Sequence, residues 1–182
     1  ILVLGAILTA LVIVLQLLGS FIRLGPFSIS LVLIPIVIGA ATCGFKTGAW
    51  LGFVFGVAVL LSGDAAVFLS VSVWGTVLTV LLKGTLCGLV AGMVYKIFEK
   101  RSQYLAVTAA AVACPIVNTG VFLLGCVLFF LPTITQWGEA EGFKNVAGYM
   151  FLGLAGGNFI VELVTNIILA PVIVRIITYK EK

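Results

Sequence analysis

Hydrophobic positions fall into six runs along the chain, separated by short clusters of polar, charged or turn-forming residues. Each run approaches the ~20 residues that an α-helix needs to cross a bilayer, although the second and third are shorter and rich in glycine. The longest polar interruption is 132–147. The pattern predicts an all-α bundle of six transmembrane helices at residues 1–19, 29–44, 47–62, 71–98, 104–131 and 148–177.

Basic residues are unequally divided between the two ends of these predicted helices. Arg23 and Lys144 lie on one side, Lys83 lies inside the fourth run, and the other seven lie on the side of both termini. Because cytoplasmic loops carry the excess of Lys and Arg, we expect both termini in the cytoplasm. The seven are Lys46, Lys96, Lys100, Arg101, Arg175, Lys180 and Lys182.

The composition supports a membrane protein. Hydrophobic residues make up 63% of the 182 positions and charged residues 9%, whereas a soluble domain carries about 25% charged residues. The basic residues form no continuous patch, so the net charge of +4 does not indicate nucleic-acid binding. We find no internal repeat and expect residues 1–182 to form one integral-membrane domain, preceded by a short polar segment because the chain begins at Ile1.

The last hydrophobic run contains an unusual line of polar residues. Asn158, Glu162 and Asn166 are spaced i, i+4, i+8, which places them on one helix face. The other ionisable residue deep in a run is Lys83, at a predicted depth similar to that of Glu162. The two charges either form an ion pair that fixes helix packing or face a ligand cavity, since intramembrane charges are costly and usually functional.

The fourth and fifth runs each add polar side chains at membrane depth. Thr79 precedes Lys83 by four residues, beside a glycine ridge at every fourth position from Gly84 to Gly92 that favours close helix packing. In the fifth run Pro115 predicts a kink, and Asn118 follows it. A buried amide requires a partner, which is either another helix or a ligand.

No set of residues in the sequence predicts catalysis or a metal site. The chain contains no histidine, and its four cysteines are scattered through hydrophobic runs. No nucleotide-binding motif is present, so we expect neither enzyme activity nor a cofactor. Aromatic residues in the outer loops either anchor the helices at the interface or cover an outward-facing pocket.

In its whole pattern the chain resembles the substrate-binding S components of energy-coupling factor (ECF) vitamin transporters. The resemblance covers essentially all residues and rests on short segments in a fixed order. These segments are 5–11 (GAILTAL), 25–29 (GPFSI), 34–39 (IPIVIG), 63–69 (GDAAVFL), 82–84 (LKG), 115–120 (PIVNTG) and 158–163 (NFIVEL).

The resemblance implies a high-affinity substrate-binding subunit in a prokaryotic plasma membrane. Such a subunit takes up a vitamin from outside and works with a transmembrane coupling protein and two cytoplasmic ATPase subunits. It implies that Ala6 and Ala10 pack against the coupling protein. It also implies a substrate pocket at Thr79, Lys83, Asn118, Asn158 and Glu162, with Arg23, Phe68, Trp74 and Trp137 near its mouth.

The substrate and the mechanism remain open at this point. Lys83 can neutralise a carboxylate, which favours pantothenate, whereas aromatic loops and amides suit riboflavin or another vitamin equally well. The alternative function is a stand-alone secondary transporter or channel in which Lys83 and Glu162 form a proton-linked gate.

Overall fold

The computed structural model describes residues 2–20, 23–24, 27–28 and 31–180, with the side chains of residues 23–24, 27–28 and 179–180 excepted. Helices dominate this part of the chain, and two short strands pair antiparallel, with Arg23 opposite Ser28. The elements are α1 (Leu2–Gly19), β1 (Arg23–Leu24), β2 (Phe27–Ser28), α2 (Leu33–Cys43), α3 (Phe45–Leu61), α4 (Ala66–Val71), α5 (Val73–Phe98), α6 (Gln103–Phe129), α7 (Leu131–Ala140), α8 (Val146–Gly148), the π-helix η1 (Tyr149–Gly156) and α9 (Gly157–Lys180).

Four helical segments of the described chain are long and apolar enough to cross a membrane. They are α1, α5, α6 and the continuous segment Val146–Thr178, which joins α8, η1 and most of α9. The predicted second and third spans are also apolar helices, but α2 has 11 residues and α3 has 17. Gly44, with φ of 91°, separates them, since a positive φ favours glycine.

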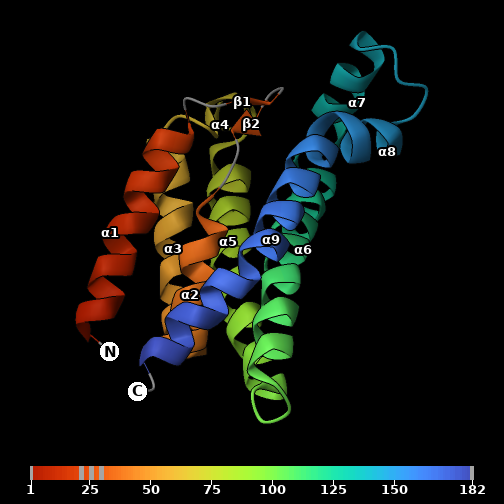
Figure 1. The fold of residues 1–182 in the computed structure, drawn as a ribbon. Coiled ribbons are helices and arrows are strands. Elements are labelled where there is room, and N and C mark those ends of the chain that lie inside the picture. The colour runs from red at the N-terminus through yellow and green to blue at the C-terminus, as the bar shows by residue number, and fades with distance from the viewer. Residues whose placement is uncertain (1, 21–22, 25–26, 29–30, 181–182) are drawn as a thin grey trace.

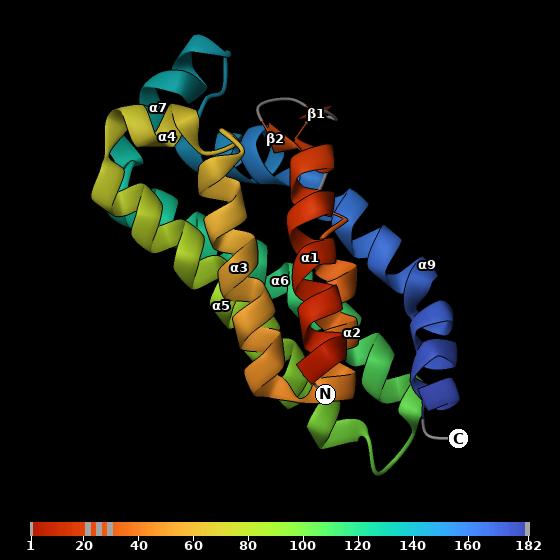
Figure 2. The same cartoon turned by 90° about the vertical axis from the view of Figure 1, so that its left-hand side faces the viewer.

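The long helices lie side by side in a bundle, with the two ends of the chain at the same end of it (Figure 1). At the other end, the short helices α4 and α7 (Figure 2) and α8 (Figure 1) form a small helical cap. Loops were expected at α4 and α7, because serines, Pro132 and several polar residues interrupt the hydrophobic pattern there. Apolar residues inside these segments instead contribute to the core: Phe68 of α4 and Ile134 of α7 are buried.

The predicted glycine ridge of α5 packs against a matching ridge on α3. A Cβ atom added at Gly52 would overlap the carbonyl oxygen of Gly84, and one added at Gly48 would overlap that of Gly88. At the end of the ridge, Gly92 lies against the backbone of Phe45. Small residues permit this close backbone approach, so the α3–α5 seam fixes the rotation of α5 about its axis.

Two hydrophobic clusters form the core. The larger joins α1, α2, α3, α5, α6 and α9 and includes Leu51 and Phe55. The smaller lies under the cap, where Phe68 and Phe130 pack with residues of α7 and η1. Most of the polar side chains predicted within the membrane lie where residues of both clusters border one cavity.

Candidate functional site

A cavity opens at the boundary between the two hydrophobic clusters. It leaves about 80 Å³ for the centres of water molecules, several times the ~10–15 Å³ that one water requires. Its walls come from α1, α3, α4, α5, α6, η1 and α9. The lining residues are Gln16, Phe55, Val59, Asp64, Ala65, Phe68, Thr76, Thr79, Val80, Lys83, Asn118, Thr119, Phe122, Phe130, Leu154, Ala155, Asn158 and Glu162.

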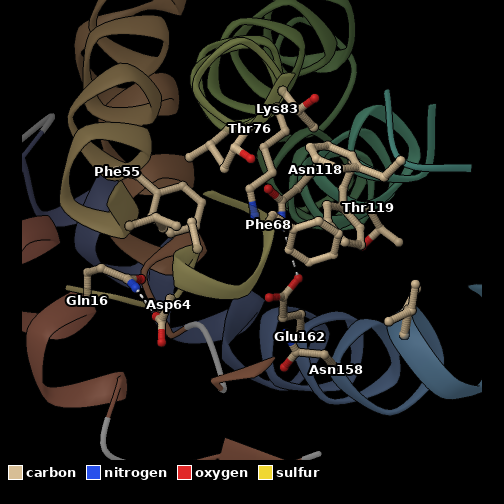
Figure 3. Close-up of a pocket in the computed structure, with 18 residues that line it drawn as sticks. Gln16, Phe55, Asp64, Phe68, Thr76, Lys83, Asn118, Thr119, Asn158 and Glu162 are labelled. Carbon is tan, nitrogen blue, oxygen red and sulfur yellow. Dashed lines mark hydrogen bonds between the residues drawn. The ribbon is translucent and has the colours of Figure 1, made fainter. Parts of the chain in front are cut away.

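All five residues predicted to form the pocket line this cavity. Lys83 enters from α5, Asn118 from α6, and Asn158 and Glu162 from α9 (Figure 3). Thr79 also lines the cavity from α5. Asn166, which continues the polar line of α9, is buried but does not line the cavity. Two of the three polar residues on that face of α9, Asn158 and Glu162, therefore line the cavity.

Lys83 supplies the cationic group of the cavity. Its Nζ atom lies 5.5 Å from the centroid of the Phe55 ring and 5.6 Å from that of Phe122, within the range of cation–π attraction. The sequence left open an ion pair between Lys83 and Glu162, but no contact within 4.0 Å joins these two described side chains. Aromatic faces stabilise a cation without neutralising its charge, so the ammonium remains able to bind an anion.

The polar residues that line the cavity have more hydrogen-bonding capacity than the protein uses. Glu162 is 4% exposed, and its Oε2 accepts one hydrogen bond, 3.4 Å long, from Nδ2 of Asn118. Oδ1 of Asn118, Oδ1 of Asn158 and Oγ1 of Thr79 are buried without a hydrogen-bond partner in the described structure. Buried polar atoms without partners are costly, so these atoms suit a ligand that donates hydrogen bonds.

Gln16 and Asp64 also line the cavity, although the sequence analysis did not select them as site residues. Nε2 of Gln16 donates a 2.5 Å hydrogen bond to Oδ2 of Asp64, linking α1 to the turn before α4. Gln16 is 2% exposed and is the single amide side chain in a helix whose other polar side chain is Thr9. That isolation within α1 was the signal that could have identified it.

The predicted mouth residues do not all lie at the cavity. Phe68 lines it and stacks edge-to-face on Phe122, Phe130 and Trp137, with centroids 5.1–5.7 Å apart. Trp137 lines a second cavity, of about 250 Å³, which shares Asp64, Phe68 and Leu154 with the first. Phe68 thus forms part of the wall of both cavities.

The other two residues predicted near the mouth are Trp74 and Arg23. Trp74 is 86% exposed at the start of α5 and lines neither cavity, which fits a side chain at the membrane interface. Arg23 lies in β1, and its side chain is outside the described part of the chain. The predicted partner-interface residues Ala6 and Ala10 are exposed on α1, away from the cavity lining.

The geometry describes a binding site for a small polar molecule within a helical bundle. One cation, an apolar aromatic wall and several unpartnered acceptors converge on a single cavity. The described residues that line it include no histidine, cysteine or serine. Recognition of a small polar molecule is the chemistry that these side chains support best.

Comparisons with known proteins agree with this description. Residues 1–177 match the family described as "ECF transporter, substrate-specific component". The chain is 28% identical over 191 residues to "Pantothenic acid transporter PanT" of Lactococcus lactis subsp. cremoris (strain MG1363), a match that covers 95% of this chain and 91% of that protein. No solved structure matches significantly. The chain is a multi-pass membrane protein and belongs to the family of substrate-specific components of ECF transporters.

Proposed function

We propose that this chain is the high-affinity substrate-binding subunit of an ECF-type importer and that its substrate is pantothenate. The observation that carries the proposal is the pairing, in one cavity, of the Lys83 ammonium with unpartnered acceptors on Thr79, Asn118 and Asn158. Pantothenate has one carboxylate, and its two hydroxyl groups and one amide N–H are hydrogen-bond donors. The similarity to a protein named as a pantothenic acid transporter supports the same substrate.

The proposed arrangement places the carboxylate of pantothenate at Lys83. A buried opposite charge offsets the desolvation of both groups when their geometry is good. The hydroxyl and amide donors then face Asn118, Asn158 and Glu162, and the dimethyl group packs on aromatic side chains such as Phe68. In this orientation the charged, polar and apolar parts of the ligand each contact a chemically complementary part of the cavity.

The membrane arrangement is part of the proposal. The four long helices, together with α2 and α3, form six spans of one integral-membrane domain, with both termini in the cytoplasm of a prokaryotic cell. The location of both chain ends at one end of the bundle supports this topology (Figure 1). The site lies nearer the capped end, which would then face outward.

Energy for uptake would come from partners, namely a transmembrane coupling protein and two cytoplasmic ATPase subunits. Ala6 and Ala10 lie four residues apart on the exposed side of α1, where small side chains allow close helix contact. Ala6→Leu combined with Ala10→Leu should abolish uptake in cells that contain these partners, and leave pantothenate affinity of the purified subunit unchanged. A loss of affinity would argue against a partner-docking role for these two residues.

The substrate is tested on protein purified in detergent. Mass spectrometry of small molecules released by denaturation identifies a vitamin retained during purification. Titration with pantothenate, riboflavin, thiamin and biotin then compares affinities, and we expect pantothenate to bind at least about 100-fold more tightly, a difference of about 2.7 kcal/mol. Tighter binding of riboflavin, or no binding of any vitamin, would contradict the proposal.

Uptake measurements separate this function from the stand-alone transporter considered above. We expect pantothenate uptake to require the coupling protein and the ATPases. Uptake that persists without them, and that depends on Lys83 and Glu162, would favour a proton-linked secondary transporter.

A further inference from the structure

We propose that the substrate anion binds together with one proton, and that the proton is held on the carboxyl group of Glu162. The inference rests on the proposed function, because it requires a ligand with one negative charge such as pantothenate. It concerns the net charge of the occupied cavity, which neither the family nor the similarity to a pantothenic acid transporter defines.

The charges that line the cavity give the first argument. Lys83 and Glu162 face its interior, whereas Asp64 is partly exposed and is held by the amide of Gln16. With Lys83 and Glu162 both ionised, the interior of the empty cavity is neutral. A monoanion adds an uncompensated negative charge to a poorly solvated site, and an uncompensated buried charge is strongly destabilising. One proton on Glu162 restores neutrality.

The hydrogen bonds around Glu162 give a second, independent argument. An ionised carboxylate can accept about four hydrogen bonds, yet the one recorded for Glu162 is the long contact from Asn118. A protonated carboxyl group instead needs an acceptor. Oδ1 of Asn118 and Oδ1 of Asn158 are buried and have no partner, and both residues lie beside Glu162 (Figure 3).

Asn118 is suited to either protonation state of Glu162. Its Nδ2 donates to the carboxylate in the described structure. A 180° rotation of the terminal amide exchanges the positions of Nδ2 and Oδ1, so the same side chain can then accept a hydrogen bond from the protonated form. A Lys side chain at position 118 could only donate hydrogen bonds, so it would stabilise the ionised form of Glu162 and not the protonated form.

No other charged group of the described structure around Glu162 replaces the proton. Helix α2 packs against α9 but contains no charged residue, and η1 contributes a tyrosine as its titratable residue. When a ligand carboxylate binds Lys83, the single positive charge of Lys83 faces two negative charges, that of the ligand and that of Glu162. The titratable residues that interact electrostatically with Glu162 or Lys83 from neighbouring elements are Cys87 on α5, Cys114 and Cys126 on α6, and Asp64 before α4.

The test measures proton uptake directly on the purified wild-type protein. Pantothenate is titrated calorimetrically at about pH 8 in two buffers with different ionisation enthalpies, and again over about pH 6–9, where a ligand carboxyl with a pKa of about 4 remains ionised. We expect uptake of close to one proton per ligand, and a dissociation constant that rises by up to about tenfold per pH unit on the alkaline side. Pantothenol, in which an alcohol replaces the carboxylate, should bind without proton uptake.

Two variants assign the proton to a residue. Glu162→Gln should abolish the dependence on buffer and pH, whatever its affinity, because an amide cannot be protonated in this range. Asp64→Asn is the matched control, since it removes the other carboxylate of the cavity, and it should keep the proton uptake. Loss of the dependence in Asp64→Asn but not in Glu162→Gln would overturn the assignment.

The outcomes distinguish this inference from the proposed function. Tight pantothenate binding with equal enthalpies in both buffers and a constant dissociation constant would overturn proton-linked binding and leave the proposed function intact. No pantothenate binding at any pH would overturn both. The wild-type measurements do not depend on any variant folding correctly.

Discussion

The two faces of α5 meet their neighbours in opposite ways. On the side of α3, Gly84 and Gly88 bring two backbones together with no room for an added methyl group. On the side of α6 and α9, Thr79 and Lys83 border a cavity in which polar atoms lack partners. One face therefore maximises contact, while the other leaves space and hydrogen-bonding capacity that the protein does not use.

The contrast shows how a membrane bundle can hold a charged site open. In lipid, helix association depends on close packing, because no hydrophobic force between helices is available. The glycine seam supplies that packing and fixes the side of α5 from which Lys83 projects. The cavity face can then remain incompletely packed until a ligand completes it.

Breaking the seam should have the largest effect on the stability of the fold. In Gly52→Ala the added methyl group overlaps the carbonyl oxygen of Gly84, so α3 and α5 must separate. We expect a stability loss of at least about 1–3 kcal/mol, visible as a lower melting temperature of the purified protein.

The matched control for the seam is Gly120→Ala on α6, where an added Cβ meets nothing within 4 Å. Its melting temperature should equal or exceed that of the wild type, because alanine favours helix more than glycine does. Equal melting temperatures of Gly52→Ala and Gly120→Ala would contradict the close approach of α3 and α5.

Removing the cation from the cavity face should have the largest effect on affinity. Lys83→Met substitutes an uncharged, apolar side chain of similar length, and leaves the proposed ligand carboxylate without a counter-charge. We expect pantothenate binding to weaken by about 2–5 kcal/mol, at least about 30-fold, with a smaller loss for pantothenol.

Lys96→Met provides the matched control on the same helix. Lys96 also lies over an aromatic ring, 6.0 Å from the centroid of Phe45, but it is exposed and far from the cavity lining. Its affinity for pantothenate should remain at the wild-type value. Equal losses in both variants would indicate that the net charge of the protein, rather than a local contact, controls binding.

The smallest predicted effect concerns the aromatic wall shared by the two cavities. Phe68→Leu removes three edge-to-face ring contacts, each worth about 0.5–1.5 kcal/mol, but retains an apolar side chain. We expect pantothenate to dissociate up to about tenfold faster in a stopped-flow measurement. Trp74→Leu, at a highly exposed aromatic residue, should leave the rate unchanged, and a faster rate there would extend the site to the start of α5.

The sequence by itself determined the helical membrane class and much of the candidate site. The hydrophobic runs correspond to α1, α2, α3, α5, α6 and the Val146–Thr178 segment. Asn118, Asn158, Glu162 and Lys83 were recognised because polar groups in apolar helices are costly, and all four line one cavity. The short helices α4 and α7 were missed, since polar and turn-forming residues in both segments predict loops.

The tertiary structure decided which of these polar faces meet and what lies between them. Helical periodicity places Asn158, Glu162 and Asn166 on one face of α9, but the packing of α9 within the bundle buries Asn166 outside the cavity. It also brings Gln16 of α1 to Asp64 and leaves Trp74 outside. Local sequence fixes the side of a helix on which a residue projects, whereas its neighbours depend on contacts between distant segments.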